Sequence, residues 1–304
     1  MRPTARSLLK QLLPPAALRR VREAQTTVQG LRLPATRRSF QGAPTSPGYL
    51  APEALSPLQS RYPILPEYGY DSADLARRGQ ARAEEILRLP GASAARTFLE
   101  IGCWDGMVSC ALQQGGKQAM AVDNRADGFD ARASRAGVRL LQADATSLQL
   151  ENDSFDVVFS YDTFEHVAEP ERVLQEAARV TRKGGHVFLQ FGPLFCSPFG
   201  QHAYRSIRVP YCHVLFAKQA LQEFASEHGL APIEFADVNE WSLGRFRGLW
   251  QKYAPQLCKV EYREIRDLAH LGLIREHPSC FKSKSALLDD FIVSSIHVVF
   301  QKLN

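Results

Sequence analysis

The sequence lacks the long apolar run that a membrane-spanning helix needs. Such a helix takes about 18 or more consecutive apolar residues, and no stretch of the 304 residues approaches that length. Cysteine is sparse too, and no C-x-x-C pair occurs among the six cysteines. This spacing excludes a zinc knuckle and a regular disulfide framework, and it is typical of reduced thiols in a cytoplasmic protein.

Acidic residues are nearly missing from the first 40 positions, which hold nine arginines and lysines but a single acid, Glu23. The net charge of the whole chain is +5, so the remainder is close to neutral. A nearly neutral body gives no reason to expect nucleic acid as a partner.

Residues 7–29 predict a basic amphipathic helix, in which leucines supply one side and which Pro14 and Pro15 interrupt. Three interpretations are open for this amphipathic segment: a helix on an anionic membrane surface, an organelle transit peptide, or a basic tail. We favour the first. The protein is then expected in the cytoplasm, with peripheral contact to the membrane surface through this segment.

Seven prolines lie in residues 34–66, together with many serines, glycines and alanines. This composition predicts a linker or an extended arm instead of a packed element. We therefore divide the chain into a basic N-terminal segment with its proline-rich linker, residues 1–66, and a folded domain, residues 67–304. The first helix of that domain is expected from Asp71 to Leu89.

The folded domain is organised around a glycine turn. Residues 97–101 predict a buried strand, Gly102 and Gly106 predict a tight turn, and a helix is expected from Met107. Glycine lets the backbone turn sharply or a ligand come close, and the free N–H groups of a helix start favour a polar or anionic ligand. The dinucleotide fingerprint G-x-G-x-x-G is missing, because Trp104 and Met107 occupy its second and third glycine positions.

Acidic residues follow the next two predicted strands. Asp123 ends the strand at residues 118–122, where it is placed to accept hydrogen bonds from a ribose diol, and Asp144 follows the strand at residues 138–142. The next elements are predicted at residues 154–160 (strand), 170–181 (helix) and 186–191 (strand). This alternation predicts an α/β, Rossmann-like fold with a parallel sheet and helices on both faces.

The last third of the chain departs from this alternation. A helix is expected at residues 217–228, a sixth strand at residues 233–238, and a seventh, antiparallel strand at residues 290–301. Between the last two strands, residues 241–283 predict a helical insert that forms a lid over the substrate pocket.

Several motifs occur in a fixed order along residues 97–224: Glu100-x-Gly102-x-x-x-Gly106, Asp123, Asp144, Phe155-Asp156-Val157-Val158, Glu165-His166-Val167 and Lys183-Gly184-Gly185. Together they resemble the class I S-adenosylmethionine (SAM) methyltransferases of the methyltransferase-11/23 type. The resemblance implies SAM as cofactor. The residues expected to bind it are Glu100, Gly102, Cys103, Gly106, Asp123, Asn124, Asp144, Ala145, Ser160 and Tyr161.

Asp162, Glu165 and His166 are the expected catalytic residues, because one helical turn would place their side chains on one side. Acid-x-x-acid-His also resembles the metal-binding segment of the RNA 3′-end and ubiquinone-type O-methyltransferases. This resemblance implies a divalent ion, Mg²⁺, Mn²⁺ or Zn²⁺, with His202 and His213 as further candidate ligands. The alternative is that His166 acts without metal, as a general base or in shaping the cofactor site.

We therefore expect a SAM-dependent methyltransferase that methylates a hydroxyl of a small molecule, a glycan or a lipid-linked intermediate, with or without a divalent metal. Two alternatives remain: a nucleotide-dependent oxidoreductase on a Rossmann-like fold, and a methyltransferase-like scaffold without catalysis.

Overall fold

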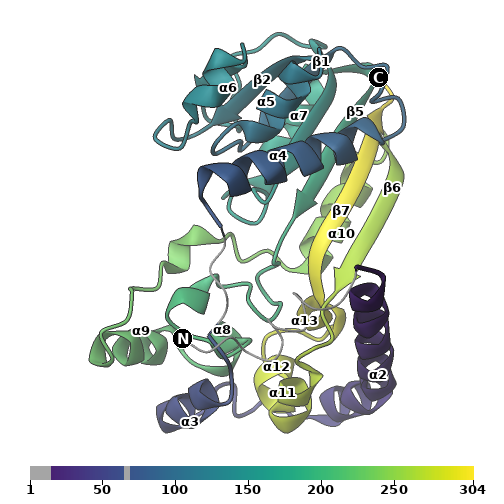
Figure 1. The fold of residues 1–304 in the computed structure, drawn as a ribbon. Coiled ribbons are helices and arrows are strands. Elements are labelled where there is room, and N and C mark those ends of the chain that lie inside the picture. The colour runs from purple at the N-terminus through teal and green to yellow at the C-terminus, as the bar shows by residue number, and fades with distance from the viewer. Residues whose placement is uncertain (1–14, 65–68) are drawn as a thin grey trace.

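A computed structural model describes residues 15–64 and 69–304 of the chain (Figure 1). The basic helix predicted from Ser7 lies outside the described residues as far as Pro14. Helix α2 (Pro15–Gly42) is the first described element. Among the described residues, no helix is both long enough and apolar enough to cross a bilayer.

One sheet of seven strands forms the centre of the described structure, in the order β3-β2-β1-β4-β5-β7-β6. The strands are β1 (Thr97–Ile101), β2 (Gln118–Asp123), β3 (Arg139–Gln142), β4 (Phe155–Tyr161), β5 (Thr181–Phe191), β6 (Leu257–Arg266) and β7 (Val293–Lys302). Strand β7 runs antiparallel to both of its neighbours, whereas β1 to β5 pair in parallel. The predicted seven-stranded, mostly parallel sheet with a final antiparallel strand is confirmed.

Helices cover both faces of this sheet because successive strand residues point to opposite sides. Phe98 belongs to the core under one set of helices, and its neighbour Leu99 belongs to the core under the other. The first set is α4 (Ser72–Leu87), α5 (Met107–Gln114) and α6 (Ala131–Arg135); the second is α7 (Pro170–Val180) and α10 (Leu243–Tyr253). Asp71 caps α4 as predicted, since its side chain accepts hydrogen bonds from Ala73 and Asp74.

A second hydrophobic core lies beyond the carboxyl ends of β4 and β5, below the sheet in Figure 1. Its side chains come from three distant parts of the chain: residues 33–62, 196–235 and 268–292. The contributing helices are α2, α3 (Leu55–Ser60), α8 (Cys212–Leu215), α9 (Lys218–Glu227), α11 (Leu271–Glu276), α12 (Pro278–Lys282) and α13 (Asp289–Ile292).

The prediction of an unpacked linker at residues 34–66 is wrong for much of that stretch. Helix α2 continues through Pro34 to Gly42, and Phe40, Leu55 and Leu58 are buried in the second core. Gln59 is buried as well, and its side chain hydrogen-bonds the backbone of Ser206 and Arg208. Burial of these large side chains stabilises the segment enough to outweigh the helix-breaking tendency of proline.

The predicted strand at residues 233–238 is also wrong, because this stretch holds the 3-10 turn η3 (Phe235–Asp237). The sixth strand is β6, inside the stretch predicted as a helical insert. The rest of that stretch is divided: α10 covers the sheet, with the Trp250 ring 5.3 Å from the Phe300 ring, while α11 and α12 pack in the second core. Strand β6 was missed because it is an edge strand with many charged residues, which hide the alternation of a half-buried strand.

Replacing Phe40 tests whether the N-terminal segment is part of the folded structure. Phe40 is 1% exposed and its ring lies 5.9 Å from that of Phe291. We expect Phe40→Ala to lower the free energy of unfolding by about 3–5 kcal/mol through lost burial and a residual cavity. Urea unfolding followed by circular dichroism measures this. Leu31→Ala in the same helix is the control, because Leu31 is 77% exposed; equal effects of both changes would contradict the packing described here.

Candidate active site

The glycine turn joins β1 to α5 and takes the left-handed backbone conformation at two positions. Gly102 has φ +72° and Gly106, which precedes α5, has φ +71°. A Cβ atom at Gly102 would lie 2.2 Å from Oγ1 of Thr163, in the turn after β4. Glycine is therefore required here because another turn of the protein packs against it, whereas the sequence had indicated a close approach by a ligand.

Glu100 does not lie with the other predicted cofactor residues. Its carboxylate is buried against α5 and accepts hydrogen bonds from the backbone N–H (3.1 Å) and the hydroxyl (2.7 Å) of Ser109. Burial raises the pKa of Glu100 to about 8. In this structure Glu100 connects β1 to α5 inside the protein, a role that sequence spacing does not reveal.

Asp123 and Asp144 lie at the adjacent ends of β2 and β3. The Asp123 carboxylate accepts hydrogen bonds from the backbone N–H groups of Trp104 (2.8 Å) and Arg125 (3.1 Å), one on each oxygen. Because a carboxylate oxygen has two lone pairs, each can accept a further bond from a ribose hydroxyl. The exposed Asp144 accepts a bond from Thr146 N–H, and this bond lowers the pKa of Asp144.

Asn124 and Ala145, the next residues of the predicted cofactor set, directly follow these two acids; Asn124 is exposed and Ala145 half-buried. Asp123 and Asn124 thus remain near the edge of the sheet together with Asp144 and Ala145. These four residues could hold an adenosine group, and this assignment stays a prediction.

Three other predicted cofactor residues point into the protein. Cys103 is buried, the Ser160 hydroxyl donates a hydrogen bond to the carbonyl of Ile101 (2.7 Å), and the Tyr161 hydroxyl contacts Glu85 of α4 (3.0 Å). Strand β4 extends one residue further than predicted, to Tyr161. As a result, Tyr161 also belongs to the strand, and the side chains of Ser160 and Tyr161 bond to other parts of the protein.

Two arginines that the sequence analysis did not single out reach this edge from α4. Arg82 pairs with Asp162 and lies over the Tyr161 ring, with its guanidinium carbon 4.5 Å from the ring centroid. Arg78, one turn earlier, lies 3.9 Å from Asp105 in the glycine turn. Guanidinium groups bind carboxylates well, so this pair could hold the carboxylate of an amino-acid ligand. In the sequence, the i, i+4 spacing of Arg78 and Arg82 was the feature that could have placed both side chains on one side of the helix.

The turn after β4 carries the predicted catalytic residues. Asp162 is exposed and points to Arg82 on α4, away from the other two. Glu165 is buried; one carboxylate oxygen accepts a hydrogen bond from Gly192 N–H (3.0 Å), and the other has no hydrogen-bond partner among the described residues. Burial, with a smaller contribution from the charge of Asp162, raises the pKa of Glu165 to about 8.

His166 is held by a backbone group from a distant segment. Its Nδ1 lies 2.5 Å from the carbonyl oxygen of Asp237, in turn η3. Because a carbonyl oxygen only accepts hydrogen bonds, Nδ1 carries the proton when the ring is neutral, and Nε2 keeps its lone pair. Asp237 was missed by the sequence analysis, which placed a strand there.

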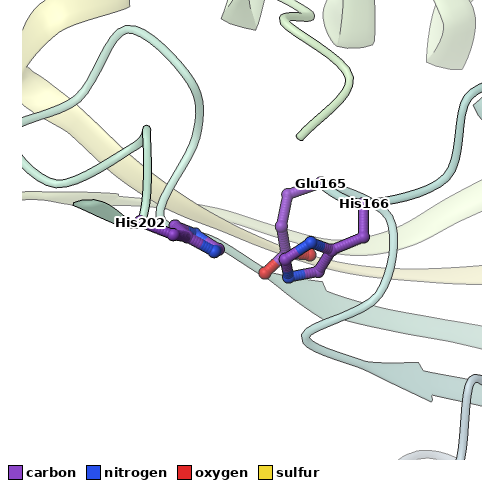
Figure 2. Close-up of side chains that lie close together, drawn as sticks. All are labelled: Glu165, His166 and His202. Atoms are coloured by element: carbon purple, nitrogen blue, oxygen red, sulfur yellow. The ribbon is translucent and has the colours of Figure 1, made fainter. Parts of the chain in front are cut away.

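His202 completes the cluster from the loop that follows β5. Its ring centroid lies 4.8 Å from that of His166. Nε2 of His202 is buried without a partner in the described part of the chain, and burial lowers the pKa of His202 to about 4. Figure 2 shows that the side chains of Glu165, His166 and His202 point toward one another, and one ligand atom of each lies within 4.8 Å of the others.

His213, also predicted as a metal ligand, lies outside this cluster. Its Nε2 is 2.5 Å from the carbonyl oxygen of Phe195, and its ring packs 4.8 Å from the Phe195 ring. Burial lowers the pKa of His213 to about 4. Of the five predicted metal ligands, the structure therefore brings three together and directs Asp162 and His213 to other partners. The three that converge offer one oxygen and two nitrogens, a set suited to proton transfer or to a divalent ion.

The burial of Glu100 is expected to make the stability of the protein depend on pH. Its pKa is about 8 in the folded protein and near 4.5 otherwise, so the folded state loses stability as the pH rises between these values. Glu100→Gln removes this loss. We expect its unfolding free energy to match wild type near pH 5 and to exceed it by on the order of a few kcal/mol at pH 8.5. The exposed Glu227→Gln is the control; parallel pH profiles for Glu100→Gln and wild type would contradict the placement.

Comparison with known proteins identifies relatives of this chain. Residues 99–189 match the model of the methyltransferase domain family Methyltransf_11. An uncharacterized methyltransferase of Mycobacterium sp. (strain JLS) is 28% identical over 218 residues, 64% of this chain and 83% of that protein. One from Mycolicibacterium vanbaalenii is 32% identical over 143 residues, 46% of this chain and 53% of that protein.

A solved SAM-dependent methyltransferase from Archaeoglobus fulgidus shows a TM-score of 0.45 at 12% identity, over 75% of this chain and 94% of that one, a likeness too low to bear on the assignment. The family match and the curated relatives favour methyl transfer over the oxidoreductase alternative. Residues 99–189 thus match a methyltransferase domain, and the family match and the curated relatives together support a class I SAM-dependent methyltransferase.

Proposed function

We propose that this protein transfers the methyl group of SAM to a hydroxyl oxygen of a small molecule, a glycan or a lipid-linked intermediate. One observation supports the choice of a hydroxyl: Glu165, His166 and His202 converge beyond the carboxyl ends of β4 and β5. The sulfonium methyl of SAM is already activated, so the protein must mainly align the reactants. A hydroxyl acceptor must in addition lose its proton, which requires groups of this kind.

His166 is the proposed base. Its Nδ1–H is engaged by the Asp237 carbonyl, so Nε2 is the nitrogen that can take a proton. In the reaction an oxygen–carbon bond forms, the carbon–sulfur bond of SAM breaks, and the proton of the hydroxyl moves to Nε2. His202, which is neutral at pH 7 because of its lowered pKa, adds no charge that would oppose this transfer.

The same residues fit a divalent ion such as Mg²⁺, Mn²⁺ or Zn²⁺. Two buried atoms, Oε2 of Glu165 and Nε2 of His202, have no hydrogen-bond partner within the described ranges, as expected of ligand atoms. A bound ion would lower the pKa of the substrate hydroxyl. In that case Glu165, His166 and His202 would hold the ion, without the predicted ligands Asp162 and His213.

Replacement of His166 separates catalysis from SAM binding. We expect His166→Gln to lower kcat by at least about 100-fold, while the Kd for SAM, measured by calorimetry, changes less than twofold. His228→Gln, which alters the exposed histidine directly after α9, is the control. Activity is read as transfer of label from SAM to candidate hydroxyl compounds, checked by the added mass of one methylene group.

The same assay also distinguishes proton removal by His166 without metal from activation of the hydroxyl by a divalent ion. Activity that EDTA removes and Mn²⁺ restores would support the metal, and activity that survives thorough chelation would support His166 as a base without metal. Full turnover by His166→Gln would contradict both. Failure of the wild-type chain to bind SAM at millimolar concentration would instead favour the non-catalytic scaffold.

We also propose that the N-terminal segment contacts an anionic membrane surface. The outer side of α2 exposes Leu31, Arg32, Arg37 and Arg38, which combine an apolar side chain with three positive charges. We expect the triple change of these arginines to glutamine to weaken sedimentation with vesicles containing phosphatidylserine, with neutral vesicles as the control. Unchanged binding to the anionic vesicles would contradict this proposal.

A further inference from the structure

A short segment between α9 and α10 forms hydrogen bonds to the turn that carries Glu165 and His166. Asn239 makes three hydrogen bonds to this turn. Its backbone N–H donates to the carbonyl of Glu165 (2.9 Å), and its side-chain amide donates to the carbonyls of Phe164 (2.6 Å) and Val167 (2.9 Å). With the Asp237 carbonyl on Nδ1 of His166, four bonds join two segments that are more than 70 residues apart.

The segment that makes these bonds is itself fixed. The side-chain oxygen of Asn239 accepts a hydrogen bond from Trp241 N–H (3.0 Å). The Trp241 ring packs 5.2 Å from the Phe246 ring, and Leu243 and Phe246 of α10 are buried against the sheet. The position of the turn is thereby tied to the core of the sheet through α10.

The amide side chain at position 239 has no simple substitute. It donates two hydrogen bonds and accepts one, so it satisfies carbonyl groups of the turn and an N–H group of its own segment together. Aspartate would retain the acceptor but place a charge beside two carbonyl oxygens, and alanine would leave all of these groups unpaired.

We propose that Asn239 is a positioning residue for methyl transfer, and that the Asp237 carbonyl fixes His166 in the tautomer with the proton on Nδ1. The catalytic part of this inference rests on the proposed function. Asn239 contacts no reacting atom; it acts by holding Phe164 to Val167 so that Nε2 of His166 faces Glu165 and His202. Partners of this kind change metal affinity or activity by about 10- to 100-fold when they are removed.

The tautomer can be measured in the wild-type chain without any substrate. Long-range proton–nitrogen NMR spectra of metal-free, histidine-labelled protein distinguish a proton on Nδ1 from one on Nε2, and the signals of His166 are identified by their absence in His166→Gln. We expect the proton on Nδ1. A proton on Nε2 in the wild-type protein would overturn the proposal, whatever the variants do.

Variants at position 239 test the positioning role. We expect Asn239→Ala and Asn239→Asp to lose the single tautomer of His166 and to reduce kcat by about 10- to 100-fold, with the Kd for SAM within twofold of wild type. Asn152→Ala is the matched control, because Asn152 also has a hydrogen-bonded side chain, to Arg179, and lies just before β4, at the opposite edge of the sheet. Folded variants with a wild-type tautomer and turnover would overturn the positioning role.

The readouts keep this inference separate from the proposed function. If neither variant at position 239 folds, the tautomer of His166 in the wild-type protein alone decides whether the inference holds. If no acceptor hydroxyl is ever methylated, the proposed function fails, yet the NMR spectra still show whether Asp237 and Asn239 hold His166 as described.

Discussion

The hydrogen bond from Gly192 N–H to the buried carboxyl of Glu165 is the contact on which the site depends, because it joins the turn after β4 to the turn after β5. It satisfies only one of the two carboxyl oxygens. Burial raises the pKa of Glu165, and a buried carboxyl with an open oxygen favours a proton or a cation beside it. The two imidazoles that face Glu165 are therefore placed where they could share a proton or a divalent ion with its carboxyl.

The site lies between the sheet and the second hydrophobic core. The sheet supplies the turn with Glu165 and His166, while the loop that supplies His202 leads from β5 into the second core. That core includes Phe40, Leu55 and Leu58 from the N-terminal segment. The N-terminal segment is thus part of the structure that supports the acceptor side of the site, in addition to its proposed contact with a membrane.

Much of the sheet could be predicted from the sequence, because glycine turns and buried apolar runs are local signals. The fold, the positions of β1 to β4 to within one residue, and the acids Asp123 and Asp144 follow from such signals. Contacts between distant residues have no local signal. Three such contacts form only when separate segments pack together. They are the hydrogen bond of His166 to the Asp237 carbonyl, the hydrogen bonds of Asn239 to the turn after β4, and the buried hydrogen bond of Glu100 to Ser109. Strand β6 was hidden by its charged residues, and the packed N-terminal segment by its prolines.

A crystal structure with S-adenosylhomocysteine and Mn²⁺ would show whether Glu165, His166 and His202 surround the point of methyl transfer. We expect the adenosine beside Asp123 and Asp144, with the sulfur facing the three side chains and Mn²⁺, if bound, held between them. A nucleoside bound elsewhere, or a sulfur directed away from Glu165, would contradict this expectation.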